Sequence, residues 1–368
     1  MKSSLLAVFY ALMLLYSAAT PALEIKNVHH DRAAFDIEKG EQISIQFTLS
    51  SAATVALNIF DGRELLMRTL ATQTVLPAGV HQLSWDGKDQ AGHPVSPGAY
   101  HYTLQAKASS GETVEHDLTD LTGGSDLEVK DIKWDPEQGK LRYVLPATAR
   151  VNIRVGLKND GPLLRTLINW VPRTGGLREE TWDGKDESGV LDLSHHPQLL
   201  IGIQAYSLSD NAIVIGPDQN MVTLVEDLSW GKTRRVVKQS SQKRMYAHEQ
   251  QPLETRGDFA IELKLPDRTP RNKDGITVVS GVVPVRLDID DKDRVRALAR
   301  RFESAFYLDG IFVFENETGF LPMTWNWDAS SVNPGLHHLT ANLRGYEGNF
   351  GIATLKVYVK PKEGQADE

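Results

Sequence analysis

One pattern occurs twice in the sequence and sets the main constraint on the fold. Residues 85–92 read WDGKDQAG, and residues 182–189, which lie 97 positions further along the chain, read WDGKDESG. The tripeptide RTL at residues 68–70 returns at the same distance, at residues 165–167. The repeats of solenoid proteins span roughly 20–50 residues, whereas a small β-sandwich spans about 100 residues. The period therefore predicts a duplicated sandwich domain.

Each copy has the pattern of short strands. Apolar and polar residues alternate in ISIQFTL (43–49) and in TVALNIF (54–60), as is typical of half-buried β-strands. The second of these segments ends in Asp61-Gly62, a pair that favours a hairpin turn. Short strands of this kind, separated by corners rich in Gly and Pro, indicate an all-β fold class of tandem β-sandwiches.

A series of turn and core residues in the first copy carries a resemblance to a known family. In chain order these are Asp61-Gly62, Arg68-Thr69-Leu70, Pro77-Ala78-Gly79, Trp85-Asp86-Gly87, Ala91-Gly92 and Pro97-Gly98-Ala99-Tyr100. The segment resembles the immunoglobulin-like (Ig-like) domain of bacterial flagellar hook-capping proteins. The second copy keeps the Trp-Asp-Gly half but has DLSHHPQLLIG (192–202) in place of the Pro-Gly-Ala-Tyr corner. Over residues 40–210 the resemblance implies two Ig-like sandwiches, of a type also common in exported bacterial proteins.

The repeated Trp-Asp-Gly triplet admits three interpretations. As a structural turn, its Trp would be buried, its Asp would accept hydrogen bonds from nearby amides, and its Gly would supply a positive φ. A calcium site would need six to eight oxygen ligands, more than the motif offers, and an exposed Trp would suit stacking on a sugar. We favour the structural interpretation, with Lys88 and Asp89 at an exposed tip. The predicted turn and core residues are Trp85, Asp86, Gly87, Trp182, Asp183 and Gly184.

The N-terminus has the layout of a secretory signal peptide. A positive charge at Lys2 is followed by an apolar run from Leu5 to Tyr16 and then by small residues. The run is too short for a permanent membrane-spanning helix, so we expect cleavage after Ala19 or Ala22 rather than an uncleaved anchor. No transmembrane segment is expected after cleavage. The predicted location is the periplasm or the cell exterior.

Residues 227–254 interrupt the strand pattern with a basic and polar segment. Like charges at this density repel one another and resist burial without paired acids, which favours an exposed linker or arm. The alternative is a docking patch for an acidic partner or a polyanion. The residues of that candidate patch are Lys232, Arg234, Arg235, Lys238, Lys243 and Arg244.

The C-terminal part has the pattern of a third sandwich. Alternation in VVPVRLDID (282–290) indicates a strand, and Asn326-Trp327-Asp328 followed by Pro334-Gly335 resembles a motif of bacterial Ig-like modules. Residues 291–306 form the one predicted helix, with Asp291 as its N-cap and an apolar face made of Val295, Leu298, Ala299 and Phe302.

These patterns divide the chain into five segments. The expected ranges are a signal peptide at 1–22, Ig-like sandwiches at 23–120 and 121–226, a basic linker or arm at 227–254, and a C-terminal Ig-like module at 255–368.

No metal site is expected. The acidic run from Asp288 to Asp293 resembles the start of a calcium loop, but it lacks the Gly at the sixth loop position and the Glu at the twelfth, which favours helix capping. Adjacent histidines on a strand point to opposite faces, so a single pair cannot chelate a metal. Only convergence of pairs from different domains would change this. The pairs are His29-His30, His195-His196 and His337-His338.

Composition and motifs narrow the function. The formal net charge of −8 disfavours nucleic acid or an anionic membrane as the main partner, and the lack of cysteine excludes disulfides and thiolate chemistry. The sequence contains no hydrolase elbow, metalloprotease motif or phosphate loop. We expect a non-catalytic structural or adapter protein, without a cofactor, that binds protein partners at the cell envelope. The alternative is a carbohydrate-binding module or an accessory subunit of a polysaccharide-active or secretion system.

Overall fold

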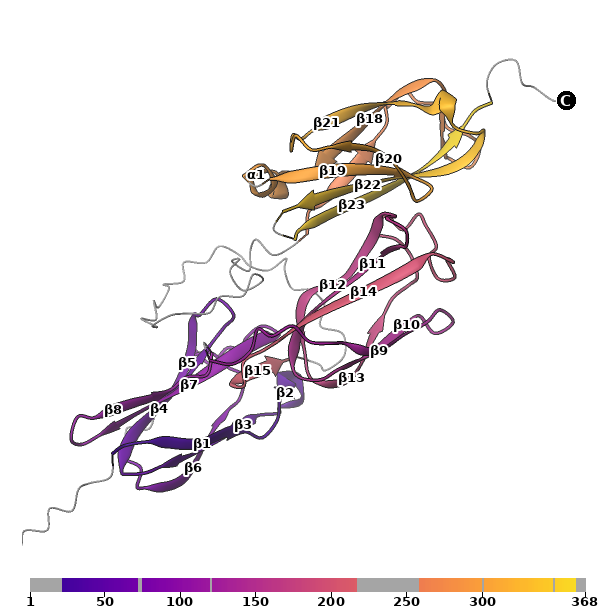
Figure 1. Ribbon diagram of the computed structural model, residues 1–368. Coiled ribbons are helices and arrows are strands. Elements are labelled where there is room, and N and C mark those ends of the chain that lie inside the picture. The colour runs from indigo at the N-terminus through magenta and orange to yellow at the C-terminus, as the bar shows by residue number, and fades with distance from the viewer. Residues whose placement is uncertain are drawn as a thin grey trace, which may run out of the picture.

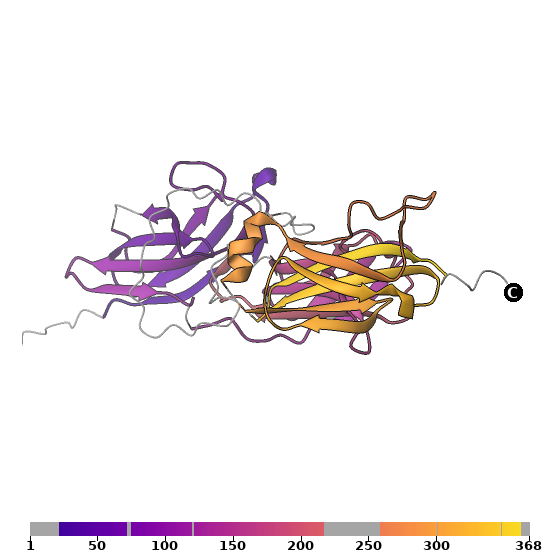
Figure 2. The ribbon, with the colours of Figure 1, turned by 90° about the horizontal axis from the view of Figure 1, so that it is seen from above.

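The computed structural model describes residues 22–71, 75–119, 121–216, 258–299, 301–346 and 348–361. These residues form three β-sandwiches, which confirms the all-β class (Figure 1). Seen from above, the third sandwich lies over the second, and the first extends to one side (Figure 2). The predicted signal peptide, up to residue 21, and the basic cluster lie outside the described residues.

Two sheets form the first sandwich. One has the order β1-β3-β6, with strands β1 (Ile25–His30), β3 (Ile43–Leu49) and β6 (Gly79–Trp85). The other has the order β2-β15-β7-β4-β5, and β8 also pairs with β7. Its strands are β2 (Ala34–Phe35), β4 (Ala53–Phe60), β5 (Leu66–Ala71), β7 (Gly98–Ala108), β8 (Thr113–His116) and β15 (Ala212–Ile215), and the short helix η1 (Ile37–Lys39) follows β2.

The core of the first sandwich follows directly from the sequence periodicity. Every second residue of β3 is buried, from Ile43 to Leu49, and β4 has the same alternation along most of its length. Since side chains alternate across a strand, each strand presents one apolar face to the facing sheet. The fully buried indole of Trp85 lies between these faces, edge-on to the rings of Phe35 and Tyr100.

Strand β15 belongs to the first sandwich although it follows the second in the chain. It pairs antiparallel with β7, from Ala212 opposite His101 to Ile215 opposite Gly98. Its side chains of Ile213 and Ile215 are buried in the core of the first sandwich. The range 121–226 predicted for the second sandwich includes these residues, whereas their backbone pairing joins them to the sheet of the first sandwich that contains β7. The second sandwich is therefore an insertion between two pieces of the first.

The second sandwich repeats the topology of the first with fewer strands. One sheet has the order β13-β10-β9 and the other the order β12-β11-β14. The strands are β9 (Lys130–Asp135), β10 (Lys140–Leu145), β11 (Ala149–Leu157), β12 (Leu163–Arg173), β13 (Gly176–Thr181) and β14 (Leu199–Ser207). Strand β14 occupies the place of β7, so the strand survives although the Pro-Gly-Ala-Tyr corner is missing.

The third sandwich has a three-stranded and a five-stranded sheet. Their orders are β16-β18-β21 and β17-β23-β22-β19-β20. The strands are β16 (Ile261–Lys264), β17 (Thr277–Val279), β18 (Val282–Ile289), β19 (Phe302–Leu308), β20 (Ile311–Asn316), β21 (Met323–Asp328), β22 (Gly335–Gly345) and β23 (Phe350–Val359). The short helix η3 (Ala329–Ser331) follows Trp327 and Asp328, and Asp328 caps it by accepting a hydrogen bond from the Ser330 amide.

The predicted helix at 291–306 is twice as long as the observed one. Helix α1 spans Asp291–Leu298, its N-cap is Asp290 rather than Asp291, and strand β19 begins at Phe302. The expected apolar face is also wrong, because Val295 is 77% exposed while Asp293 and Ala297 are buried. The periodicity misled because alternate residues of β19, which face the core, continued an apparent helical stripe.

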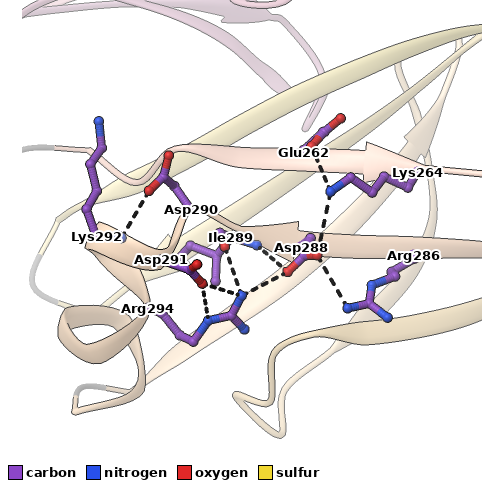
Figure 3. Close-up of polar contacts among 9 residues, drawn as sticks. All are labelled: Glu262, Lys264, Arg286, Asp288, Ile289, Asp290, Asp291, Lys292 and Arg294. Carbon is purple, nitrogen blue, oxygen red and sulfur yellow. Dashed lines mark hydrogen bonds and ion pairs between the residues drawn. The ribbon is translucent and has the colours of Figure 1, made fainter.

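The acidic run at the start of α1 is neutralised by basic side chains (Figure 3). Asp288 lies within 3.7 Å of Lys264, 3.4 Å of Arg286 and 3.3 Å of Arg294. Partial burial opposes ionisation, but the Ile289 amide and the neighbouring guanidinium groups hold the pKa of Asp288 below its usual value. Asp290 accepts a hydrogen bond from the Lys292 amide at 3.0 Å. These contacts are those of an ion-paired strand end and a helix cap.

We expect Ile213→Ala to destabilise the first sandwich, although residue 213 follows the second. Loss of a fully buried Ile side chain costs about 2–5 kcal/mol. The measurements are the free energy of chemical unfolding and the hydrogen-exchange rates of the backbone amides in β4 and β7. Ile311→Ala is the matched control, because Ile311 is 70% exposed and should change stability little. Equal effects of the two variants would show that β15 does not complete this core.

Candidate functional site

The two Trp-Asp-Gly turns have the same hydrogen bonds. In the first copy the indole nitrogen of Trp85 donates to the carbonyl oxygen of Lys88 at 2.9 Å, and in the second Trp182 donates to Lys185 at 2.9 Å. Both indoles are buried, with exposed fractions of 0% and 2%. A buried indole offers no face to a sugar, so neither Trp is a stacking platform.

The Asp and Gly of each triplet shape the turn. Asp86 accepts a hydrogen bond from the Lys88 amide at 3.2 Å, and Asp183 accepts one from the Lys185 amide at 3.1 Å. Gly87 and Gly184 both have φ of +74°, and a Cβ atom at Gly184 would lie 2.0 Å from the hydroxyl of Ser194. Backbone conformation and space therefore both require glycine.

The following Asp of each motif organises the next loop rather than an exposed tip. Asp89 is half-buried and its counterpart Asp186 fully buried, whereas the Lys88 side chain is 44% exposed, so of the expected exposed tip only Lys88 lies in solvent. Asp89 accepts hydrogen bonds from the amides of Ala91 and His93, each at 2.9 Å, and these bonds, that of His93 first, lower its pKa. Asp186 accepts from the amides of Val190 and Leu191.

The repeated arginine is part of the same structure. Arg68 donates to the carbonyl oxygen of Asp89 at 2.9 Å, and Arg165 donates to that of Asp186 at 3.1 Å. In each copy the arginine of the RTL segment, on β5 or β12, thus contacts the end of the WDGKD segment. This contact explains why the two segments repeat with the same spacing. The repeated residues are explained by folding, without a ligand.

The second and third sandwiches meet at a polar contact centred on Asp258. Its carboxylate accepts hydrogen bonds from the hydroxyl of Thr166 at 2.7 Å and the amide of Phe350 at 2.9 Å, and it lies 3.4 Å from the guanidinium of Arg154. Arg296 donates to the backbone carbonyl of Asp258 at 2.9 Å. Burial raises the pKa of Asp258, and the charge of Arg154 opposes that shift.

Further contacts fix the same two sandwiches together. The carboxamide of Asn342 on β22 pairs with both backbone groups of Leu163 on β12, at 2.8 Å and 2.7 Å. The hydroxyl of Ser188 accepts a hydrogen bond from the Thr354 amide at 2.8 Å. Arg154 also donates to the carbonyl of Gly348 at 2.7 Å. Partners of this kind impose one relative position, because each buried polar group has a fixed counterpart.

A cavity of about 130 Å³ lies between these two sandwiches. Its walls are mostly apolar, but Asp309 and one histidine from each of two pairs, His196 and His338, also line it. Burial lowers the pKa of His338, which favours the neutral imidazole. Within the ranges that the structure describes, no three His, Asp or Glu side chains are arranged to hold a metal ion.

Sequence reasoning placed the turn residues but missed the junction. The predicted turn residues lie at two separate turns, one in each of the first two sandwiches: Trp85, Asp86 and Gly87 in the first, and Trp182, Asp183 and Gly184 in the second. The candidate docking residues Lys232, Arg234, Arg235, Lys238, Lys243 and Arg244 lie outside the described residues. Asp258, Arg154 and Asn342 are far apart in the chain, so no local pattern marked them.

Comparison with known proteins identifies one domain. Residues 32–112 match the model of the FlgD Ig-like domain family, which confirms the resemblance seen in the first copy. No curated protein matches the sequence.

Three similar solved structures were compared over the chain. The fibronectin(III)-like modules of CbhA from Clostridium thermocellum share 10% identity at a TM-score of 0.21, over 93% of this chain and 98% of that one. FlgD from P. aeruginosa shares 18% identity at a TM-score of 0.22, over 33% of this chain and 81% of that one. A bacterial ice-binding adhesin, described for host cell surface retention, shares 11% identity at a TM-score of 0.19, over 93% of this chain and 100% of that one. Likeness at this level says nothing about function.

We expect Asp258→Ala to loosen the junction without unfolding either sandwich. The change removes the acceptor of the Thr166 hydroxyl and the Phe350 amide and the ion-pair partner of Arg154, and leaving buried donors unsatisfied costs about 1–3 kcal/mol. Small-angle X-ray scattering should show a larger radius of gyration, and calorimetry a transition that separates into steps. Asp291→Ala, which removes a carboxylate that is 93% exposed, is the control. Unchanged scattering and melting for Asp258→Ala would contradict the role of this contact.

Proposed function

We propose that this chain is an exported, non-catalytic adapter that binds protein partners at the bacterial cell envelope. The observation that carries the proposal is the way in which the sandwiches are joined. The second is inserted into the first, whose strand β15 follows it in the chain, and the second and third share the Asp258 contacts. Joints of this kind hold surfaces on different sandwiches at a fixed distance, as a connector of two proteins requires.

Several features support a binding role over a catalytic one. The repeated Trp, Asp, Gly and Arg residues, which are the most distinctive in the sequence, are used in folding contacts. Ig-like domains are generally binding modules, and function in such folds depends on their surfaces. None of the described helices is long and apolar enough to cross a membrane. The signal peptide that we expect at residues 1–22 supports a location in the periplasm or outside the cell.

The carbohydrate-binding alternative has less support. Trp85 and Trp182 are buried, so sugar stacking would have to use other aromatic residues. Phe320 and Tyr346 in the third sandwich are exposed, but Phe320 lies between β20 and β21 and Tyr346 after β22. Stacking on a polysaccharide needs rings aligned along one surface, and no contact between these two rings supports such a platform.

The basic cluster of residues 232–244 is proposed as one docking surface for an acidic protein partner. We expect the variant with Arg234, Arg235, Lys238 and Lys243 replaced by Gln to capture less partner from an envelope extract, with a weaker dependence on salt. Its melting temperature should not change. The control replaces four exposed lysines elsewhere, namely Lys107, Lys133, Lys273 and Lys360.

The same experiment tests the proposed function. Chemical cross-linking of the native chain in the envelope should give defined protein adducts, and the control variant should give the same ones. Retention on polysaccharide beads with no protein adduct would contradict the adapter and favour carbohydrate binding. Equal capture by both variants would remove the basic cluster from the docking surface.

A further inference from the structure

The second sandwich has an open strand edge at a place where the corresponding edge of the first sandwich is paired. In the first, β7 pairs with β4 on one side, and its other side is filled by β15 along Gly98–His101 and by β8 along Leu104–Lys107. Strand β14, the counterpart of β7, pairs with β11 along all nine of its residues. Its other side has no strand among the described residues.

The open edge can be defined by its backbone groups. Near the end of β14 the carbonyl of Ala205 accepts from the Leu127 amide, and the amide of Ser207 donates to Ser125, each at 2.9 Å. Alternate residues of a strand point their backbone groups to the same side, and the pairing with β11 has no bulge. The N–H and C=O groups of Ile201 and Ile203 therefore point away from β11, and within the described ranges no backbone group meets them.

Burial shows the same gap. Ile201 and Ile203 are only half-buried, whereas the β7 residues 99 positions earlier, Tyr102 and Leu104, are buried. In the first sandwich the corresponding backbone is met by the carbonyl of Asn211, directly before β15, and by β8, whose His116 pairs with Leu104. Among the described residues the second sandwich has no strand at that place.

The edge of β14 also lacks the usual protection against pairing. Natural edge strands carry lysines, prolines or bulges that block the addition of another strand. Strand β9 follows this rule, because it contains Lys130 and Lys133 and a positive φ at Asp131 with a shifted register. Strand β14, with the sequence LLIGIQAYS, has no charge, no proline and no bulge.

We propose that the free edge of β14, centred on Ile201 and Ile203, accepts an extended apolar segment of a partner protein as an antiparallel strand. The inference rests on the proposed adapter function and names one of its binding surfaces. Strand β15 on β7 is the precedent for the occupant, because it is an antiparallel apolar segment that enters from outside the local hairpins. Backbone hydrogen bonds would supply affinity, and apolar residues at alternate positions, packing on Ile201 and Ile203, would supply specificity.

The test uses the full chain and a peptide that copies residues 210–216, DNAIVIG, with two lysines added at each end for solubility. At millimolar peptide, hydrogen exchange at Ile201 and Ile203 should slow at least tenfold, while exchange at Tyr102 and Leu104 stays constant because that edge is already paired. Two further peptides carry N-methyl groups on the alternate sets of residues. One set faces β14, so only one of the two peptides should bind.

Protein variants give a second readout. Ile203→Lys places a charge at the half-buried edge and should weaken peptide binding at least tenfold, whereas Leu177→Lys, on β13 of the same sandwich at a residue that is 64% exposed, should change it less than twofold. Circular dichroism checks the fold of both.

The inference is overturned if exchange in β14 does not slow, if both N-methylated peptides bind alike, or if protection appears instead at another apolar edge such as Ile311–Asn316 of β20. In that case protein adducts that persist in the envelope would leave the adapter function standing without this surface.

Discussion

The hydrogen bonds along the outer edge of β7 are the constraint on which the arrangement of the chain depends. That edge is satisfied by β8 over one half and by β15 over the other, and β15 is reached only after the chain has built the second sandwich. Unpaired backbone groups beside a core are costly, so the first sandwich is complete only when the later segment returns. The two sandwiches are consequently joined at both ends of the inserted one, which limits their relative motion more than a single linker would.

The duplicated domain has kept its internal contacts and changed its outer ones. Both copies retain the bonds of the buried Trp to the turn and of the Arg to the next loop. At the surface they differ. Thr69 of the first copy donates to Asn58 within its own sheet, whereas Thr166 of the second donates to Asp258 and so holds the third sandwich. Ser188, which replaces Ala91 in the motif, also contacts the third sandwich. The second copy thus contacts the third sandwich through one residue that both copies share, Thr166, and one that differs, Ser188.

Short-range features could be predicted from the sequence, and long-range ones could not. The Trp-Asp-Gly turns depend on contacts within a few residues, and the alternation in β3 arises because one face of a single strand packs on one core. Both features could therefore be predicted from the sequence. The four residues of β15, AIVI, are all apolar and all buried, but nothing local says which sheet they join. The end of α1 was missed because alternate inward residues of β19 resembled a helical face. Asp258 gained its role only through Arg154, Thr166 and Phe350, which lie about a hundred residues away.

The most direct test of the interlocked arrangement compares two fragments, residues 22–119 and residues 22–216. The first contains every strand of the first sandwich except β15, and the second restores β15 together with the inserted sandwich. Calorimetry of the longer fragment should show a cooperative transition with protected amides in β7. The shorter fragment should melt far lower or without cooperativity, because the edge of β7 and the core beneath Ile213 and Ile215 are exposed. A first sandwich that melts at the same temperature in both fragments would contradict the claim that the returning strand completes it.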